Sequence, residues 1–472
     1  IFLKMAMAMN RLFGRFMNVR QNVLSSMKLS SLSESELQDI GRERICHGVG
    51  RMTELVLERG EGSYVYTTEG AKYLDMTCGI GVTNTGHCHP RVVKAAQDQM
   101  GKLMHGQVNI AFQKPMIELC DKLAKKVMPF DLDTFFFWNS GSEAVESAIK
   151  LARHATGKSN ILVFQGGYHG RTIGAMSLTT SKTIYRAGYS PLMSGVSVTP
   201  FPYTYQFKNW ISNTKDNNSL SKDELDDICM KYCLEQLRLV LCQQADPKEV
   251  AAMIIEPVQG EGGYVVPPKE FLKALRAICD EHGILLIADE VQSGFGRTGK
   301  FFAMEHFDTR PDILIFAKGL ASGMPLSGIA STRKLMDTQP AGSQGGTYAG
   351  NAVACAAASA TVDVIIEEDL LTNTQVRGDE MMGGLRAILE KHSVTHDVRG
   401  LGLMIGCEFS GRKKGVAGAV SKGCLERGML LLTTGVFETL RFIPPLNITT
   451  QEVQAALTIF DQALEQAIAD GY

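Results

Sequence analysis

Lys318 and Asp289 are the two residues whose types and positions first point to chemistry. Lys318 follows an apolar run at 313–317, and Asp289 follows a second run at 284–288. Short apolar runs bounded by glycine and proline are typical of buried strands in a parallel sheet, whose ligands gather at the carboxyl ends of the strands. An amine and a carboxylate at that edge suit a Schiff-base lysine and an acid that keeps a heterocyclic nitrogen protonated. The alternative is two ordinary surface charges, so other motifs must decide.

A Gly/Ser loop at 139–143 lies between a phenylalanine-rich run and a helical pattern at 144–154. The first amides of a helix have no partner within the helix, so such a loop suits a phosphate. The helix dipole adds only about 0.3 to 2 kcal/mol, so several N–H bonds and hydroxyls must supply the rest. The alternative is a plain helix cap, because Ser140 and Glu143 have the spacing of a capping box.

A second glycine-containing loop, 166–172, follows the apolar run 161–164. Its glycines let the backbone approach a ligand, and Tyr168 could stack on a planar ring. Arg171 could bind a carboxylate through two parallel hydrogen bonds. The alternative is a tight turn whose arginine faces solvent.

Two motifs are rejected as ligand sites. Residues 294–299 match the dinucleotide fingerprint G-x-G-x-x-G, but the acidic pair at 289–290 stands between the strand and the glycines and would repel a pyrophosphate. The triplet at 87–89 (His-Cys-His) has no second ligand cluster at zinc spacing, so we predict no metal site.

The composition excludes several kinds of partner. A net charge of −2 offers no electrostatic basis for binding nucleic acid or an anionic membrane, and no apolar stretch reaches the length of a membrane span. The eleven cysteines form no paired framework, which favours a reducing compartment. Residues 1–33 are basic, contain serines and lack acids, as mitochondrial transit segments do. The alternative is a basic arm on a cytosolic enzyme, so we expect either the mitochondrial matrix or the cytoplasm.

From about residue 132 to 336 apolar runs alternate with helical patterns, which predicts an α/β fold with a mostly parallel, helix-covered sheet. Residues 204–250 interrupt this rhythm and are predicted to be a surface insertion with a helix at 222–244. The expected division is a basic arm (1–33), the N-terminal part of a small domain (34–95), a large ligand-binding domain (96–359) and the C-terminal part of the small domain (360–472).

With these motifs in this order over about residues 40 to 465, the chain resembles the class III pyridoxal-phosphate aminotransferases, most closely the 4-aminobutyrate (omega-amino acid) branch. The resemblance implies a type I aminotransferase fold, in which both chain ends form a smaller α+β domain. It also implies pyridoxal 5'-phosphate as cofactor and a homodimer with shared active sites.

The resemblance also implies cofactor contacts. Gly141 and Ser142 would bind the phosphate, and Thr347 would reach the phosphate of the neighbouring subunit. The remaining roles fall on the ring: Tyr168 and Val291 would pack on its two faces, Asp289 would hold its nitrogen protonated, Gln292 would bond its hydroxyl, and Lys318 would form the Schiff base.

For the substrates, the resemblance implies that Arg171 binds the distal carboxylate of an omega-amino acid and that Ile80 contacts the substrate. Arg441 would bind the alpha-carboxylate of the acceptor, and Glu261 would neutralise Arg441 when that carboxylate is absent. The predicted reaction transfers an amino group from a 4-aminobutyrate-like donor to a 2-oxo acid such as 2-oxoglutarate.

Several alternatives remain open at this stage. Within the same superfamily they are an acetylornithine/ornithine-type, an alanine–glyoxylate-type or an amine:pyruvate aminotransferase. A racemase or decarboxylase would use the same scaffold, because fold-level likeness does not determine the substrate. A catalytically silent binding protein is a further alternative, although it would have no physical need for both Lys318 and Asp289.

Overall fold

The computed structural model describes residues 32–211, 220–410 and 413–472. The basic arm predicted at 1–33 therefore lies outside the described residues, apart from its last two. The chain forms two compact units, of which one comprises the residues up to Arg59 together with Val65–Lys72 and the other comprises Gly60–Tyr64 and Tyr73–Tyr472. The predicted domain boundaries at 95 and 359 stay predictions.

The first unit contains helix α2 (Glu34–Arg44) and most of strands β1 (Leu57–Glu61) and β2 (Tyr64–Thr67). A capping box at Ser33 and Glu36 starts the helix. The carboxylate of Glu34 accepts a hydrogen bond from the Thr68 hydroxyl at 3.1 Å, which ties the start of α2 to the chain after β2.

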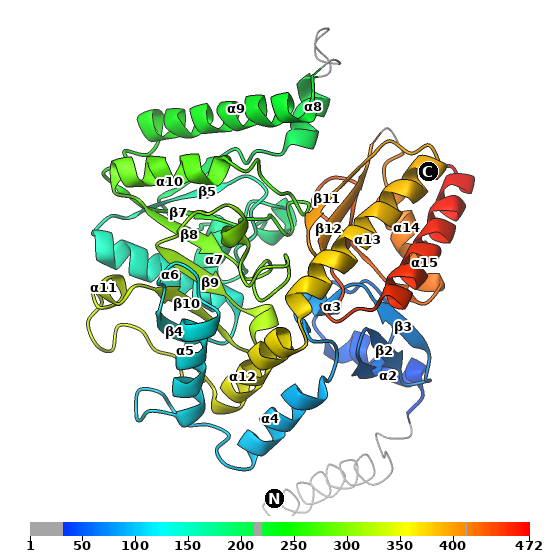
Figure 1. Ribbon diagram of the computed structural model, residues 1–472, viewed down its shortest axis with the longest axis horizontal. Coiled ribbons are helices and arrows are strands. Elements are labelled where there is room, and N and C mark those ends of the chain that lie inside the picture. Colours follow the sequence, from blue (N-terminus) through cyan, green and yellow to red (C-terminus); the bar gives the residue numbers. More distant parts are fainter. Residues whose placement is uncertain (1–31, 212–219, 411–412) are drawn as a thin grey trace, which may run out of the picture. The chain divides into compact units, whose positions relative to one another are not determined.

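The second unit is built around a seven-stranded sheet of order β4-β10-β9-β8-β7-β5-β6 (Figure 1). Its strands are β4 (Thr134–Trp138), β5 (Asn160–Phe164), β6 (Val196–Thr199), β7 (Val250–Ile255), β8 (Leu285–Asp289), β9 (Ile313–Phe316) and β10 (Ser327–Ser331). β10 is antiparallel to both its neighbours, and the pairings from β9 to β6 are parallel. This arrangement confirms the predicted α/β class with a mostly parallel sheet.

Both faces of the central sheet are covered, because alternate residues of its strands enter different apolar clusters. In β5, Phe164 packs in the cluster that contains α10 (Phe271–His282), and Val163 packs in the cluster that contains α6 (Gly141–Thr156). Every residue of β7 is buried. Such two-sided burial explains why these strands appear in the sequence as continuous apolar runs.

The segment at 204–250 forms two helices, α8 (Thr204–Ile211) and α9 (Lys222–Gln243), above the sheet in Figure 1. The helix predicted at 222–244 is α9, whereas α8 was not predicted. Leu237 and Leu241 of α9 are buried in the same cluster as α10. One side of α9 is therefore part of the core, so the segment is more than a surface addition.

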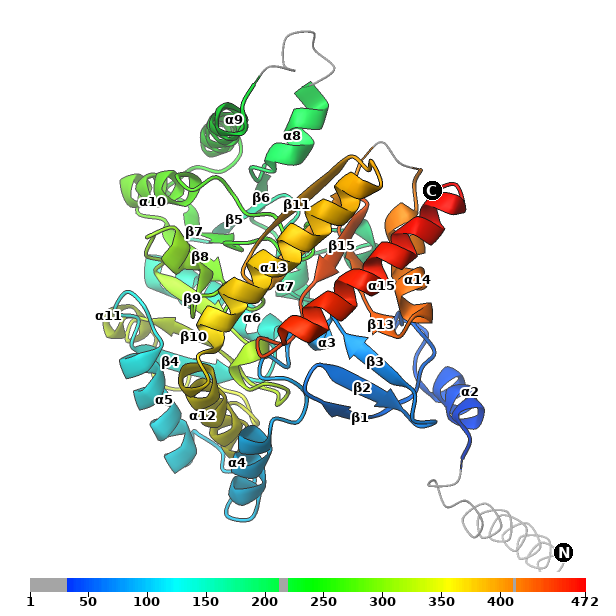
Figure 2. The same ribbon diagram turned by 45° about the vertical axis from the view of Figure 1, so that its right-hand side comes forward.

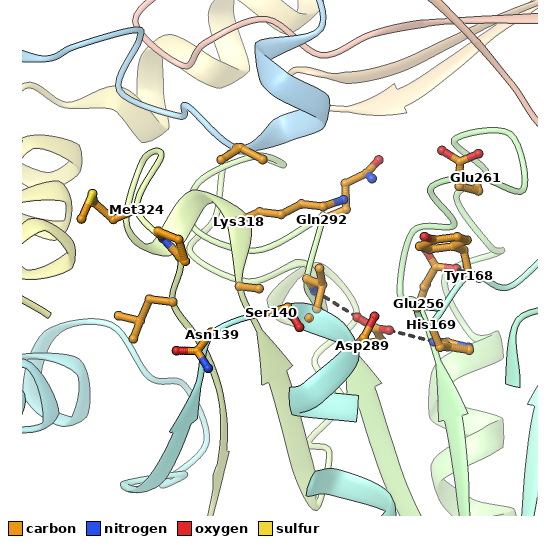
Figure 3. A pocket seen from close by; sticks show the side chains of 18 of the residues that line it. Asn139, Ser140, Tyr168, His169, Glu256, Glu261, Asp289, Gln292, Lys318 and Met324 are labelled. Carbon is orange, nitrogen blue, oxygen red and sulfur yellow. Dashed lines mark hydrogen bonds and ion pairs between the residues drawn. The ribbon is translucent and has the colours of Figure 1, made fainter. Parts of the chain in front are cut away.

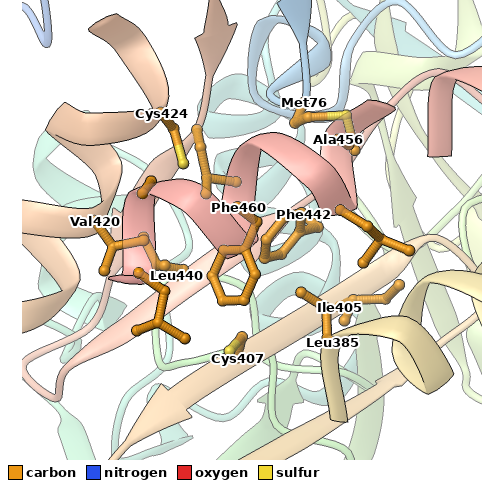
Figure 4. Close-up of a cluster of buried hydrophobic side chains, with 14 of the residues drawn as sticks. Met76, Leu385, Ile405, Cys407, Val420, Cys424, Leu440, Phe442, Ala456 and Phe460 are labelled. Carbon is orange, nitrogen blue, oxygen red and sulfur yellow. The ribbon is translucent and has the colours of Figure 1, made fainter. Parts of the chain in front are cut away.

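A second, antiparallel sheet has the order β11-β12-β15-β14. Its strands are β11 (His396–Leu401), β12 (Met404–Phe409), β14 (Leu432–Thr434) and β15 (Thr439–Phe442). Helices α13 (Leu370–Lys391) and α15 (Thr450–Ala469) lie side by side over it (Figures 1 and 2). Phe442 and Phe460 meet edge to face at 5.7 Å in the core between the sheet and its helices, which also include α14 (Val416–Glu426) (Figure 4). This core holds strand β15, and with it Arg441, in place.

The other elements connect or support these two sheets. Long helix α12 (Ala352–Glu367) packs against α4 (Pro90–Met100) and α5 (Lys114–Lys126). The shorter elements are β3 (Lys72–Asp75), α3 (Cys78–Gly81), α7 (Ile173–Leu178), η2 (Thr183–Tyr185), η4 (Ala303–His306), η5 (Lys318–Leu320), α11 (Arg333–Met336) and β13 (Met429–Leu430). Within the described ranges, no helix combines the length and apolar character needed to cross a membrane.

Candidate active site

A cavity of about 330 Å³ lies at the carboxyl ends of the central strands (Figure 3). Most of the predicted site residues line it: Gly141, Ser142, Tyr168, Glu261, Asp289, Val291, Gln292 and Lys318. The chain reaches the cavity directly after β4, β5, β7, β8 and β9, which is where ligands of parallel sheets bind. The remaining four predicted residues, Ile80, Arg171, Thr347 and Arg441, are not among the lining residues.

Lys318 follows β9 at the start of η5 and has φ = 43°, in the left-handed region that non-glycine residues rarely adopt. Such backbone conformations cluster at functional sites. Burial, together with the nearby Arg441 cation, lowers the pKa of the Lys318 amine to about 8, against the opposing field of the Glu261, Glu256 and Asp289 carboxylates. The neutral, nucleophilic amine is therefore far more accessible here than for an ordinary lysine.

Asp289 ends β8 and is held by two hydrogen bonds. Its Oδ1 accepts the Val291 amide at 3.1 Å, and its Oδ2 lies 2.7 Å from Nδ1 of the buried His169 (Figure 3). Burial by itself would lower the pKa of His169, but the hydrogen bond and charge of Asp289 outweigh burial and raise it. The pair therefore favours a protonated imidazole, which donates a hydrogen bond to Asp289.

Glu256 is a third buried group beside this pair. Burial raises the pKa of its carboxyl to about 7, against the field of His169. Its two oxygens accept the amides of Tyr168 at 2.8 Å and Gly260 at 2.9 Å. Glu256 thus fixes the backbone of the loop that carries Tyr168 and His169.

The start of α6 has both features that the sequence left as alternatives. Ser140 forms a capping box with Glu143, while the amides of Gly141 and Ser142 lie in the first turn, where a helix provides no acceptor. A Cβ at Gly141 would lie 3.0 Å from Val291 Cγ1, so glycine permits this close approach. Gly170, with φ = 127°, allows the loop after β5 to contact Ser142 in the same way, since a Cβ there would lie 2.9 Å from the Ser142 Cα. Within the part of the chain that the structure describes, the amides of Gly141 and Ser142 donate to no backbone acceptor, so a helix start with free donors lines the cavity.

The three side chains that were predicted to contact the cofactor ring, those of Tyr168, Val291 and Gln292, all line the cavity. Tyr168 and Val291 line it from the loops after β5 and β8. Oε1 of Gln292 is buried and, among the described residues, has no hydrogen-bond partner. An orphaned buried acceptor costs about 1 to 3 kcal/mol, which a ring hydroxyl bound there would recover.

Arg441 and Glu261 form a buried ion pair, Nη1 to Oε1, although they are 180 residues apart in the chain. Burial by itself would raise the pKa of Glu261, but the charge and hydrogen bond of Arg441, together with the Lys182 charge and the Tyr185 hydrogen bond, outweigh burial and lower the pKa. Arg441 reaches Glu261 from strand β15, and Glu261 lines the cavity. Glu261 is therefore in contact with Arg441, the residue whose charge it was predicted to neutralise.

Arg171 lies at the rim and is largely exposed. Its Nε donates to the Tyr168 hydroxyl at 3.2 Å, and its guanidinium carbon lies 4.3 Å from the ring centroid of Tyr185. Tyr185 in turn donates its hydroxyl to Glu261 Oε2 at 3.0 Å. One aromatic side chain therefore links the two predicted carboxylate-binding arginines.

Ile80 and Thr347 are placed apart from the cavity lining. Ile80 is exposed and has φ = 66°, and the neighbouring cavity residue is Val82. Thr347 is also exposed. Their predicted contacts with substrate and with a partner's cofactor stay predictions.

These features fit pyridoxal phosphate. The cavity offers an amine with a lowered pKa, a carboxylate fixed on a strand end, an unpaired amide oxygen and a helix start with free amides. The donor set matches the aldehyde, the ring nitrogen, the ring hydroxyl and the phosphate, respectively.

The sequence did not point to four residues in or next to this site. They are His169, Glu256, Tyr185 and Lys182, the last of which has its Nζ 3.7 Å from Glu261 Oε2. His169 adjoins Tyr168 in a loop already singled out, and Glu256 ends an apolar run as Asp289 does, so the same strand-end rule could have found it. Tyr185 and Lys182 lie in a segment without a recognisable motif, and no sequence signal pointed to them.

Comparison with known proteins places these features in a family. A sequence model of the class-III aminotransferases matches residues 46–464. The 5-aminovalerate aminotransferase DavT of Pseudomonas aeruginosa is 41% identical over 89% of this chain and 95% of its own length. The 4-aminobutyrate aminotransferase GabT of Escherichia coli is 38% identical over 92% of this chain and 99% of its own.

Other reactions and structures occur at comparable similarity. The alanine/serine racemase of Pyrococcus horikoshii is 37% identical over 92% of this chain and 90% of its own. Among solved structures, an (S)-enantioselective omega-transaminase from Thermomicrobium roseum superposes with a TM-score of 0.83 at 30% identity, covering 93% of this chain and all of that one. The predicted type I aminotransferase fold is thereby confirmed.

Proposed function

Because the chain belongs to the class-III aminotransferases, which depend on pyridoxal 5'-phosphate, we propose that it moves the amino group of an omega-amino acid to a 2-oxo acid. The donor is 4-aminobutyrate or its homologue 5-aminovalerate, which are the substrates in the names of two relatives. The acceptor is 2-oxoglutarate. The observation that carries this choice is the buried Arg441–Glu261 pair close to a second arginine, Arg171.

When bound, the cofactor supplies an aldehyde that condenses with amines and a cationic ring that withdraws electrons from the substrate carbon. In our proposal, Lys318 would hold the cofactor through its Nζ, and its amine would serve as the general acid–base that moves the substrate's proton. Asp289, fixed by His169, would keep the ring nitrogen protonated. Gly141 and Ser142 would hold the phosphate, Gln292 would bond the ring hydroxyl, and Tyr168 and Val291 would pack against the ring.

Two arginines divide the carboxylates between them. Arg171 binds the distal carboxylate of the omega-amino acid, while Glu261 stays on Arg441. Removing one partner of a buried ion pair costs about 3 to 5 kcal/mol, so the pairing keeps Arg441 from being left uncompensated when a monocarboxylate donor occupies the cavity. When a 2-oxo acid arrives, its alpha-carboxylate replaces Glu261 on Arg441. We call this exchange on Arg441 the gate: it is closed when Glu261 is on Arg441 and open when a substrate carboxylate replaces it. The gate lets one cavity accept two differently charged substrates.

Three expectations about assembly and location belong to the same proposal. We expect a homodimer in which Thr347 contributes to the phosphate site of the neighbouring subunit, and its exposure outside its own cavity supports this. Ile80, also exposed, is expected to contact substrate. The compartment is the mitochondrial matrix or the cytoplasm.

A donor–acceptor panel tests the proposed function. Purified protein loaded with pyridoxal phosphate is given 4-aminobutyrate, 5-aminovalerate, N-acetylornithine, alanine or a monoamine, each with 2-oxoglutarate, pyruvate or glyoxylate. Glutamate formation from the omega-amino acids with 2-oxoglutarate is expected. Turnover of neither omega-amino acid, or racemisation of alanine as the main activity, would contradict it.

A further inference from the structure

Glu261 has partners beyond Arg441, and they lie on its other oxygen. Oε1 accepts from Arg441, whereas Oε2 accepts the Tyr185 hydroxyl at 3.0 Å and lies 3.7 Å from the Lys182 Nζ. The carboxylate therefore stands between two cations that approach it from different elements, strand β15 and the loop before η2.

Glu261 has little access to water from this position. Its side chain is 11% exposed and that of Arg441 is 6% exposed. A carboxylate pushed off Arg441 by an incoming alpha-carboxylate would thus remain largely buried, and a buried charge without a partner is strongly destabilising. The displaced state needs a second cation close to Glu261.

Lys182 is placed to provide that cation. Its present distance of 3.7 Å is longer than a normal charge-assisted hydrogen bond, so the contact can tighten when Glu261 turns away from Arg441. A second cavity, of about 450 Å³, lies on this side and is lined by Lys182 and by Gln259 and Gly262 of the Glu261 loop. Lys182 thus has open space beside it, and its side chain is 26% exposed.

Neighbouring side chains hold Tyr185 in place, so it need not move when Glu261 turns away from Arg441. Its ring packs edge to face on Tyr168 at 5.3 Å and lies beneath the Arg171 guanidinium. The hydroxyl can therefore remain bonded to Oε2 while Oε1 leaves Arg441.

We propose that Lys182, together with the Tyr185 hydroxyl, receives Glu261 when an alpha-carboxylate takes its place on Arg441. The inference rests on the proposed function, because it assumes that Arg441 binds such a carboxylate. Lys182 is a positioning residue that acts through Glu261. Lys182 interacts more strongly with Glu261 after Glu261 has left Arg441 than before, and only this difference shifts the equilibrium between the two states. Lys182 therefore favours dicarboxylate substrates, which displace Glu261, and is neutral toward monocarboxylates, which do not.

Equilibrium binding of two unreactive probes to the cofactor-loaded enzyme tests this. Glutarate has two carboxylates and needs the open gate, whereas valerate has one and leaves the gate closed. In Lys182→Met we expect the Kd for glutarate, measured by calorimetry, to rise about tenfold and that for valerate to change less than about twofold.

Two control variants separate this role from loss of structure. Lys182→Arg, which keeps the charge, is expected to restore glutarate binding. Lys122→Met removes a similarly buried ion pair, Lys122–Asp363 at 2.5 Å, on helix α5 outside the cavity lining, and should bind both probes as the wild type does. If Lys182→Met does not fold, Lys182→Gln makes the same removal of charge.

The outcomes are distinct. Weaker binding of glutarate with unchanged binding of valerate supports the proposal that Lys182 receives Glu261. Equal weakening of both probes, or no weakening of either, overturns it while leaving the proposed function intact. Glutarate binding to Glu261→Gln gives a further check, because this variant should bind glutarate more tightly than the wild type does. If the wild type transaminates omega-amino acids with 2-oxoglutarate but the variant shows no such gain, the exchange of Glu261 on Arg441, and with it the role of Lys182, is contradicted.

Discussion

The two ends of the active-site cavity hold their charged groups in different ways. At the ring end, Asp289 has one arrangement, fixed by His169 and by the Val291 amide. At the carboxylate end, Glu261 has cations on two sides, Arg441 and Lys182. The first end is preorganised and the second can rearrange.

The difference follows from what each end must do. The chemistry at the cofactor ring is the same for donor and acceptor, so its groups belong on rigid strand ends, where reorganisation is small. The substrates differ in the number and position of their carboxylates, so the other end needs a pairing that can exchange. The following predictions test this contrast, from the largest expected effect to the smallest.

Lys318→Ala tests the fixed end. Losing both the covalent anchor and the proton carrier should reduce turnover by about 10⁴-fold or more, since a general acid–base group alone contributes about 10² to 10⁴. The phosphate site at the start of α6 is untouched, so the cofactor should still bind, which equilibrium dialysis measures. Undiminished turnover would remove Lys318 from the mechanism.

Arg171→Ala tests the rim of the carboxylate end. The variant loses a charge-assisted bond of about 1.5 to 3 kcal/mol to the distal carboxylate, so kcat/KM for 4-aminobutyrate should fall roughly 10- to 100-fold. A monoamine lacks that carboxylate and should react nearly as it does with the wild type. Equal losses for both donors would assign Arg171 a structural role.

Glu261→Gln tests whether the carboxylate end is a switch. Glutamine keeps the shape but leaves Arg441 without its counter-charge, and only a substrate with an alpha-carboxylate can restore it. The ratio of kcat/KM for glutamate to that for 4-aminobutyrate should therefore rise about tenfold or more, equivalent to about 1.4 kcal/mol. An unchanged ratio in steady-state kinetics would contradict the gate.

The pH dependence of the Lys318 amine gives the smallest effect. A lysine whose pKa is lowered loses its proton at lower pH than usual, so in cofactor-free protein the neutral fraction of Lys318 should rise about fivefold between pH 7 and pH 8 and then level off. The reactivity of an ordinary exposed lysine keeps rising toward pH 10, and the exposed Lys334 serves as the comparison site. Mass spectrometry of both sites after brief acylation measures this, and parallel profiles would contradict the lowered pKa.

The sequence predicted the fixed end of the site better than the switchable end, for a physical reason. Lys318 and Asp289 directly follow apolar runs, and Gly141 stands in the loop after another. The carboxyl ends of parallel strands meet at one edge of a sheet, so a local pattern places these residues together. Arg441 and Glu261 are 180 residues apart, and their pairing came only from the resemblance. Lys182 and Tyr185 act through contacts that no local pattern encodes.

The fold shows the same division. The parallel strands β5, β7, β8 and β9 were visible because burial on both faces makes them continuously apolar, whereas β6, in which only the last residue is buried, was not predicted. β10 was not predicted, because its residues 327–331 are mostly small and carry no periodic signal. The second sheet was also missed: β11 is only partly buried, β14 has three residues, and the pairing of β12 with β15 joins segments distant in sequence.

The central claim is that one cavity serves an omega-amino acid and a 2-oxo acid in turn. It is tested most directly by stopped-flow absorbance of the cofactor-loaded enzyme, mixed first with 4-aminobutyrate or 5-aminovalerate and then with 2-oxoglutarate. We predict that the absorbance of the bound aldehyde form disappears in the first step and returns in the second, with one equivalent of glutamate released. Persistence of that absorbance with both donors would contradict the account.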